Sequence, residues 1–355
     1  MELSSLLGID APIVLGPFGG LSSVDLTATV SEAGGLGSFG LYGLGGDRIA
    51  AVAEELRART VRPFALNLWL PFQGPGERSP RDGFDRAEFD RALDALAPLF
   101  AEAGAQPPEW PVAPLPPFDE QLEAVLAARP AVLSVIFGVP PAELVEQAHQ
   151  RGIHVIGAAT TVPEARALEA GGVDAIVASG SEAAGHRPSF LAAPEAGLVG
   201  SMALIPQIVD AVSVPVIAAG GIADRRGVAA AFALGAAGVQ VGSAFLATRQ
   251  SAAPAVHRDR IRTADAHDTV LTRAMSGRAA RGLPNHAVRA IEERGGSASF
   301  PLQNILTGVF RRRAAEQGMP ELLSLWMGQA AGLSRFDDAA DVFAELAAGL
   351  PTPRS

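Results

Sequence analysis

The stretch that decides the fold is PVIAAGGIADRRGVAAAFALGAAGVQVGSAF, residues 215–245. Its apolar run Pro215–Ala219 predicts a buried strand, and Arg225–Leu234 predicts a helix that ends at Gly235. The run Val239–Phe245 predicts the next strand. Continuously apolar strands that alternate with helices are typical of a parallel sheet covered by helices. The stretch therefore indicates an α/β protein.

The same strand–helix unit recurs earlier in the chain. Six further short apolar runs predict strands, and they are Pro12–Gly16, Leu36–Gly40, Phe64–Leu68, Val132–Phe137, His154–Ala158 and Ala175–Ala178. With the two strands of residues 215–245, these fit a TIM (β/α)8 barrel, which usually takes about 250 residues before insertions. The alternative that this pattern leaves is an open, doubly wound sheet.

Two regions interrupt the repeat. An insertion of about residues 71–125 follows the third strand, with the Pro- and Gly-rich piece Pro71–Gly83 and a helical pattern near Ala87–Ala103. Residues 251–355 follow the eighth strand and have a mainly helical pattern. We therefore expect a barrel domain over residues 1–250 and a helical C-terminal extension over residues 251–355, packed near the barrel mouth.

The composition excludes several classes of function. The 355 residues include 38 acidic and 28 basic side chains, and contain neither lysine nor cysteine. Schiff-base aldolases and pyridoxal phosphate enzymes need a lysine amine, so both are excluded. Without cysteine the chain forms no disulfide, thiolate nucleophile or cysteine-ligated metal site. An acidic chain with scattered arginines predicts no nucleic-acid partner and no binding to anionic membranes.

The sequence predicts a cytoplasmic location. The start Met-Glu-Leu-Ser-Ser lacks the basic residues and apolar core of a signal peptide. The apolar window Gly197–Gly221 is interrupted by polar residues and Pro215. This pattern favours a helix followed by a strand rather than a membrane span.

Two glycine turns predict a phosphate site. Ala-Ala-Gly-Gly at 218–221 and Gln-Val-Gly-Ser at 240–243 follow the last two predicted strands. Glycine lets backbone N–H groups approach an anion, a following helix N-terminus favours negative charge, and barrels often bind phosphate there. Two tight turns without a ligand are the alternative. The earlier match Gly35–Gly40 to G-x-G-x-x-G overlaps a strand, so we interpret it as accidental.

One histidine lies where a barrel carries its chemistry. His186 follows the sixth predicted strand, although a polar loop residue is the competing interpretation. Its neighbour Glu182 could influence it or could be solvated. The other polar candidates are expected to be structural or solvated: His149 and His154 at a helix–strand junction, His257, His267 and His286 in polar segments, and the helix faces 224–226 and 311–313. The group Asp265, His267 and Asp268 is weak support for a metal, and we predict none.

Taken together, these segments resemble the nitronate monooxygenase family, formerly called 2-nitropropane dioxygenase. The matching segments run in order through most of the chain: 11–20, 31–37, Asn67, 179–186, 218–221, 240–243, 276–282 and 326–329. The resemblance implies a TIM barrel that holds FMN non-covalently at its C-terminal mouth. It also implies oxidation of alkyl nitronates by O2, with nitroalkanes as further candidate substrates.

The resemblance assigns roles to individual residues. His186 matches the family's catalytic base. Phe18, Asn67, Ser179 and Ala184 match positions that line the flavin. Ribityl and phosphate groups would be held by Gly221, Gln240, Val241, Gly242 and Ser243, and Gln329 would approach the flavin from the C-terminal part.

Three residues depart from the family pattern. Ser179 replaces a glutamine, Ala184 replaces a glycine, and Ile136 replaces a second pocket histidine. An alanine is harmless only where φ is negative. Two alternatives therefore stay open: a flavin-dependent enoyl-thioester reductase that uses NAD(P)H, and a flavin-binding barrel without nitronate turnover.

Overall fold

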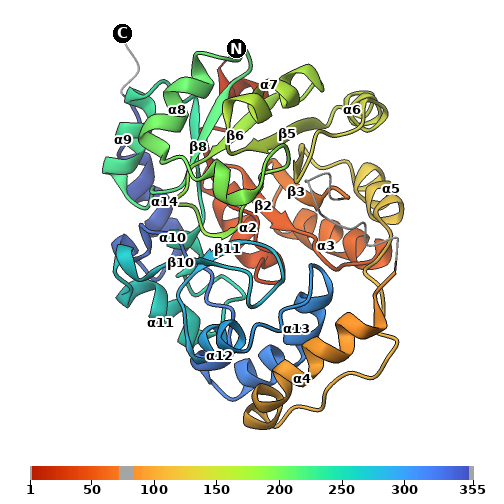
Figure 1. The fold of residues 1–355 in the computed structure, drawn as a ribbon. Coiled ribbons are helices and arrows are strands. Elements are labelled where there is room, and N and C mark those ends of the chain that lie inside the picture. Colours follow the sequence, from red (N-terminus) through yellow and green to blue (C-terminus); the bar gives the residue numbers. More distant parts are fainter. Residues whose placement is uncertain (1, 72–82, 352–355) are drawn as a thin grey trace.

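The computed structural model describes residues 2–71 and 83–351. Eight parallel strands form one sheet in the order β1-β9-β8-β6-β5-β4-β3-β2. They are β1 (Ile13–Leu15), β2 (Gly37–Gly40), β3 (Phe64–Trp69), β4 (Val132–Ile136), β5 (His154–Ala159), β6 (Ala175–Ser179), β8 (Val216–Ala219) and β9 (Gly238–Val241). A bridge between Val14 and Leu36 joins β1 to the region before β2 and closes the sheet. The predicted TIM barrel is confirmed (Figure 1).

All eight predicted strands are present, and the last is shorter than expected. β9 ends at Val241 rather than at Phe245. Gly242 leaves the extended conformation, with φ −107° and ψ −78°, and Ser243 begins the short helix α10 (Ser243–Leu246). Because this turn is apolar on both sides, the sequence alone did not separate strand from helix.

Helices surround the barrel, and several begin at a side-chain cap. The Ser23 hydroxyl accepts the Leu26 N–H at 3.0 Å, as expected for an N-cap serine. The helices of this ring are α2 (Val24–Glu32), α3 (Gly46–Arg59), α5 (Phe118–Ala128), α6 (Ala142–His149), α7 (Val162–Ala170), α8 (Ser201–Val209) and α9 (Arg225–Ala233).

A helix from far along the chain completes the ring. α14 (Ala339–Ala347) packs against both α2 and α9, beside β1. Its residues Val342, Phe343 and Leu346 are buried in the same core as the barrel strands. The approach is close: a Cβ at Gly35 would lie 2.5 Å from Phe343 Cε2, so this position requires glycine.

The opposite end of the barrel is closed by α1 (Leu3–Leu7). Leu3 and Leu7 are buried with inward-facing strand residues such as Ala65, Ile156 and Ile217. A Cβ at Gly238 would lie 2.4 Å from a Leu3 methyl group. The N-terminal end of the barrel is therefore filled by side chains, and only the C-terminal end carries the glycine turns.

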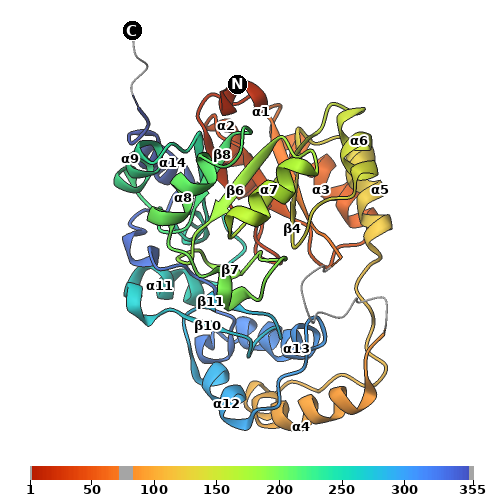
Figure 2. The same cartoon turned by 45° about the horizontal axis from the view of Figure 1, so that its top comes forward.

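A second layer lies below the C-terminal mouth (Figure 2). It joins the insertion helix α4 (Arg86–Ala103) to the C-terminal helices α11 (Ala255–Thr263), α12 (His286–Arg294) and α13 (Leu302–Glu316). Phe100 of α4 meets Phe310 of α13 edge-on, with ring centroids 5.5 Å apart. The helix expected near Ala87–Ala103 is confirmed, whereas residues 72–82 of the Pro- and Gly-rich piece lie outside the described residues.

A small antiparallel sheet joins the two layers. β10 (Val270–Thr272) pairs with β11 (Ala280–Gly282), and β11 pairs with β7 (Gly185–His186). In Figure 2 this sheet lies between the barrel and α13. Within residues 2–71 and 83–351, no helix combines the length and apolar character that a membrane crossing needs.

Candidate active site

The predicted site residues gather at the carboxyl ends of the barrel strands. Phe18 follows β1, Asn67 lies on β3, Ser179 ends β6, Gly221 follows β8, and 240–243 end β9. Several of these ends are in contact. The Gly16 N–H donates to the Val241 carbonyl at 2.9 Å, and a Cβ at Gly242 would lie 3.7 Å from Phe18 Cε1.

The two glycine turns have the backbone geometry that an anion site needs. Gly220 and Gly221 have φ of +99° and +76°, a region that favours glycine over other residues. The Ser243 hydroxyl accepts the Gly328 N–H at 3.0 Å, which leaves the hydroxyl hydrogen to donate to a ligand. These features fit the phosphate end of a nucleotide.

The helix α9, which follows the first glycine turn, offers fewer N–H donors to an anion than the sequence suggested. The Asp224 carboxylate accepts the N–H groups of Arg226 and Gly227 at 3.0 and 3.4 Å. The first turn of α9 is therefore capped by the chain's own acid. Backbone groups of the glycine turns and the Ser243 hydroxyl are the donors left for an anion.

Asn67 is held in place by the neighbouring strand. It lies level with Gly40 on β2 and Ser134 on β4. Its Nδ2 donates to the Ser134 carbonyl at 3.2 Å and to the Ser134 hydroxyl at 3.0 Å. In this orientation the Asn67 amide oxygen is the atom directed to a ligand.

His186 lies in a cage of aromatic rings. Its ring centroid is 5.2 Å from Trp69, 5.7 Å from Trp326 and 6.0 Å from Phe300. Its Nε2 lies 2.9 Å from the Ser276 hydroxyl. Burial and, second, the Arg311 guanidinium lower the pKa of His186 to about 3. The imidazole is therefore neutral at physiological pH.

Three buried arginines donate hydrogen bonds to backbone carbonyls of the loop that carries His186. Arg187 donates to the carbonyls of Ser179 and Gly180 at 2.9 and 2.6 Å. Arg281, on β11, donates to the Ser181 carbonyl at 2.8 Å, and Arg278 donates to the Ser189 carbonyl at 2.8 Å. Together with the β7–β11 pairing, these bonds fix the backbone on both sides of His186.

A family model described as nitronate monooxygenase matches residues 1–349. The chain belongs to the nitronate monooxygenase family. A probable nitronate monooxygenase of Staphylococcus aureus (strain JH9) is 35% identical over 347 residues, which cover 97% of this chain and 96% of the relative. The family prediction is confirmed, and the chain is an oxidoreductase for which family membership supports a flavin cofactor.

Solved structures agree with this assignment. A nitroalkane oxidase from Streptomyces ansochromogenes has a TM-score of 0.87 and 33% identity, covering 98% of this chain and 96% of that one. FabK from Thermotoga maritima has a TM-score of 0.73 and 30% identity, covering 97% and 94%. Both comparisons extend through the barrel and the second layer.

The departures from the nitronate monooxygenase pattern differ in their structural effect. Ala184 lies outside the positive-φ residues, so this alanine fits its backbone, and the adjacent Gly185 takes φ +70° instead. Ser179 is buried, 7% exposed, at the end of β6. Ile136 ends β4 and lies level with Trp69 on β3, so two apolar side chains are paired at these strand ends.

The C-terminal residues of the family motifs sit against the histidine loop. The Gln329 backbone N–H donates to the Glu182 carbonyl at 3.0 Å. The Glu182 carboxylate accepts the Ser201 N–H and hydroxyl at 2.9 and 2.8 Å, and so caps α8. Glu182 therefore has a structural role in place of the two roles considered for it.

Two expectations about polar residues were wrong. His257 was expected on the surface but is 1% exposed, with Nε2 3.0 Å from the Trp326 carbonyl. The run 311–313 was expected on a solvated helix face, and Arg312 and Arg313 are exposed there, whereas Arg311 is only partly exposed. Its guanidinium instead bonds Asn304 and Ser324, and its Nε is shut off from solvent. The hydrogen-bond partners of both side chains lie seven or more positions away in the sequence, so the local pattern does not reveal them.

The sequence did not point to several residues of the site. Trp69, Phe300, Trp326 and Ser276 all contact His186, yet three of them come from the C-terminal part. Tyr42 packs on Trp69 with ring centroids 4.2 Å apart. A usable signal was present, because Ser276 and Trp326 begin two of the motifs that match the family.

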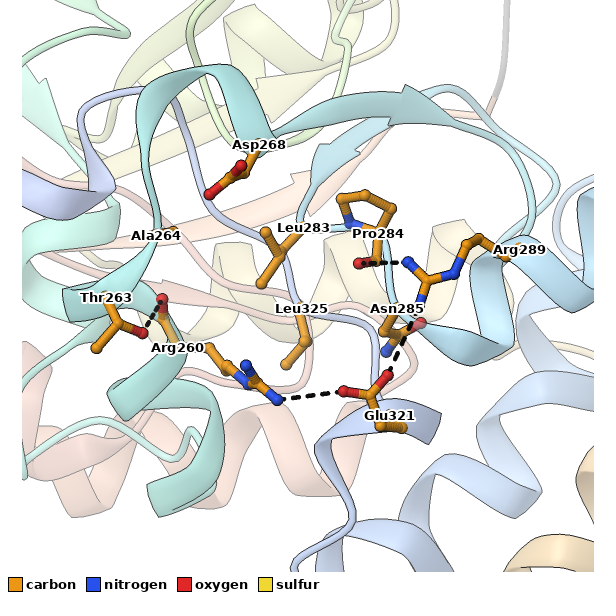
Figure 3. A pocket seen from close by; sticks show the side chains of 10 residues that line it. All are labelled: Arg260, Thr263, Ala264, Asp268, Leu283, Pro284, Asn285, Arg289, Glu321 and Leu325. Carbon is orange, nitrogen blue, oxygen red and sulfur yellow. Dashed lines mark hydrogen bonds and ion pairs between the residues drawn. The ribbon is translucent and has the colours of Figure 1, made fainter.

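A separate surface pocket lies on the second layer (Figure 3). It has a volume of about 250 Å³ and is lined by Arg260, Arg289, Glu321 and neighbours. Glu321 pairs with Arg260 at 3.2 Å and with Arg289 at 3.9 Å, and with Asp268 the lining holds two acidic and two basic side chains. No predicted site residue lines it. Across the described ranges, no three acidic or histidine side chains are grouped as metal ligands.

Proposed function

We propose that the protein oxidises alkyl nitronates with O2, using FMN held non-covalently at the barrel mouth, and that His186 is the general base for neutral nitroalkanes. The observation that carries the proposal is His186 among three aromatic rings, on a loop that touches the first glycine turn, where a Cβ at Gly220 would lie 3.0 Å from the Ala183 nitrogen. Membership of the nitronate monooxygenase family supports the same activity.

The residues present fit FMN. Gly221, Gly242 and Ser243 would hold its phosphate and ribityl groups, with Gln240 and Val241 alongside. Phe18, Asn67, Ser179, Ala184 and Gln329 would line the ring. When bound, the flavin supplies the acceptor for substrate electrons and returns them to O2.

The hydrogen-bond network indicates which nitrogen of His186 acts as the base. The Ser276 hydroxyl lies 3.0 Å from the Arg278 carbonyl, which can only accept a hydrogen bond. The single hydroxyl hydrogen is assigned to that bond, so His186 Nε2 donates to Ser276. Nδ1 then carries the lone pair. Among the described residues Nδ1 has no hydrogen-bond partner, which suits an atom that takes a proton from a substrate.

The surroundings of His186 support proton abstraction from a neutral substrate. The rings of Trp69, Phe300 and Trp326 pack around the partly buried imidazole, and its lowered pKa leaves it unprotonated at neutral pH. Ser276 fixes the ring orientation. An anionic nitronate has already lost its α-proton, so it needs no base.

The test is turnover by His186→Asn with both substrate forms. We expect kcat/KM for nitroethane to fall by about 100-fold or more, the usual contribution of a general base, while ethyl nitronate is turned over at near wild-type rate. Circular dichroism and flavin content control for folding. Equal loss with both forms would contradict the base role.

The alternative function, a flavin-dependent enoyl-thioester reductase, is distinguished from nitronate oxidation by its use of NADH as the reductant. Under anaerobic conditions, we expect ethyl nitronate to bleach the bound flavin and NADH to leave it oxidised on the same time scale. Rapid bleaching by NADH alone would favour the enoyl-thioester reductase. A yellow protein inert to both would be a flavin-binding barrel without nitronate turnover.

A further inference from the structure

A partly buried arginine is connected to the site by hydrogen bonds. Arg311, on α13, donates through one terminal nitrogen to the Ser324 hydroxyl at 2.8 Å. Its other terminal nitrogen donates to Asn304 Oδ1 at 2.6 Å and to the Asn304 carbonyl at 3.0 Å. Since a guanidinium only donates, the Asn304 amide oxygen must face Arg311.

The orientation of Asn304 extends the chain to Tyr42. With Oδ1 facing Arg311, the Asn304 Nδ2 donates to the Tyr42 hydroxyl oxygen at 2.9 Å. The phenol therefore acts as an acceptor toward Asn304, and its own hydrogen is left to donate elsewhere. Within the described residues, no acceptor for that hydrogen is present. The bonds are aligned from cation to phenol, which polarises the Tyr42 O–H.

Arg311 donates its hydrogen bonds to neutral oxygen atoms. In the part of the chain that the structure describes, no carboxylate pairs with Arg311; its bonds go to neutral oxygens. Its Nε is hidden from solvent and has no partner. Burial, as the largest effect, lowers the pKa of Arg311 to about 10, so it stays charged at neutral pH.

This charge lies beside the catalytic cage. Tyr42 packs on Trp69 at 4.2 Å and on Phe300 at 6.0 Å, and both rings contact His186. The Arg311 charge disfavours protonation of His186. Among the described residues this cation has no acidic partner, so a negatively charged ligand near Tyr42 would be stabilised by it.

We propose that Tyr42 is the residue that selects anionic substrates, donating its hydroxyl hydrogen to a negatively charged oxygen, and that Arg311, acting through Asn304, is its positioning residue. The inference rests on the proposed function and names the side chains that would recognise the negative charge of its substrate. The ligand class is a small anion with a planar, oxygen-bearing group.

The test measures anion binding apart from turnover. Sodium nitrate, an unreactive planar anion, is titrated into the flavin-loaded protein, and its Kd is read from the visible flavin spectrum and tryptophan fluorescence. The variants are Tyr42→Phe and Arg311→Met. Arg312→Met is the matched control, because it removes the same charge from an exposed neighbouring position on α13.

We expect Tyr42→Phe and Arg311→Met each to raise the Kd for nitrate by about tenfold or more, as expected for a lost hydrogen bond to a charged group. Their KM for ethyl nitronate should rise by a similar factor, while kcat/KM for nitroethane changes by less than about threefold. Arg312→Met should change neither. Arg311→Lys, which keeps the charge, should recover part of the nitrate affinity.

Unchanged nitrate affinity in Tyr42→Phe, or equal loss for ethyl nitronate and nitroethane, would overturn the inference. Tyr42→Phe leaves Arg311 in place, so the test does not depend on the folding of Arg311→Met. If the wild type binds nitrate in a Tyr42-dependent manner but does not oxidise nitronates, the proposed function fails and the anion site stands.

Discussion

At the scale of single residues, His186 differs from a histidine that is paired with an acid. Its ring nitrogens face a serine hydroxyl and an open position, and across the described residues no carboxylate is paired with it. Aromatic rings occupy the remaining directions. Burial and the Arg311 charge disfavour the protonated imidazole, so the ring stays neutral until a substrate supplies a proton.

The pH dependence of nitroalkane turnover follows from this environment. The pKa of His186 is lowered from 6.5 to about 3, so the base stays unprotonated as the pH falls from 8 to 5. We expect kcat/KM for nitroethane, corrected for its own ionisation, to stay level over this range. An ordinary histidine would lose about 30-fold by pH 5. A fall centred near pH 6.5 would show that the imidazole is not buried as described.

At the residue scale, the sequence predicted the candidate base and anion site but not the side chains that pack around them. His186 and the glycine turns were predicted because short motifs carry them. Trp69 and Tyr42 were missed, since an aromatic residue at a strand end looks like ordinary core. Arg311 was assigned to solvent because three consecutive arginines on a helix usually face water. Its burial depends on Asn304 and Tyr42, and no local pattern reveals that packing.

At the scale of elements, the loop that carries His186 is positioned by a segment far along the chain. β7 has only two residues, Gly185 and His186, and pairs with β11. Gly185 has φ +70°, and a Cβ there would meet nothing within 4 Å. Any cost of a side chain at this position is therefore backbone strain alone.

Gly185→Ala tests how tightly this loop positions the base. We expect a loss of about 1 to 2 kcal/mol in unfolding free energy, the cost of the left-handed conformation for a non-glycine residue. Nitroethane turnover should fall more than ethyl nitronate turnover, because His186 is the adjacent residue. Chemical denaturation and the ratio of the two kcat/KM values are the measurements.

Ala193→Gly is the matched control for this prediction. Ala193 has φ −57° and is exposed further along the same loop, so glycine removes no strain there and reduces stability only through the unfolded state. The ratio of nitroethane to ethyl nitronate turnover should stay at the wild-type value. If both variants shifted the ratio equally, general flexibility of the loop would explain the effect.

Strands and helices with a regular sequence pattern were predicted, and those too short to have one were missed. The eight barrel strands are continuous apolar runs, and all were predicted from that pattern. The pairing of β7 with β11 was not, because a two-residue strand has no periodicity and its partner lies more than ninety positions away. The helix α1 was also missed, since five residues are too few for a helical pattern.

At the scale of the whole molecule, the second layer is tied to the barrel mouth through buried polar contacts. His257 of α11 is 1% exposed and bonds the carbonyl of Trp326, the residue whose ring contacts His186. Burial, opposed in part by this bond, lowers the pKa of His257 to about 4. The sequence placed this histidine in a polar segment and gave no sign of its burial.

His257 makes the fold sensitive to acid. Its folded-state pKa lies below its unfolded value of 6.5, so the unfolded chain binds the proton more tightly, and stability is lost as the pH falls from 6.5 toward 4. The loss attributable to His257 at pH 4.5 is about 2 to 3 kcal/mol. We expect His257→Gln, which keeps a donor for Trp326, to lose that much less stability between pH 7 and pH 4.5.

Denaturant unfolding at the two pH values measures this difference. His267→Gln is the control, because the His267 side chain is 83% exposed. The control should follow the wild-type pH dependence. A His257→Gln variant with the same acid sensitivity as the wild type would show that other groups dominate the acid response.

The placement of α14 has a consequence for synthesis on the ribosome. The last barrel strand ends at residue 241, whereas α14 begins at residue 339. A nascent chain that already carries all eight strands still lacks the helix between α2 and α9, and the surface around Gly35 that Phe343 covers is bare. The barrel therefore keeps an apolar surface exposed until residues beyond α13 have been synthesised, and exposed apolar surface of this kind favours aggregation.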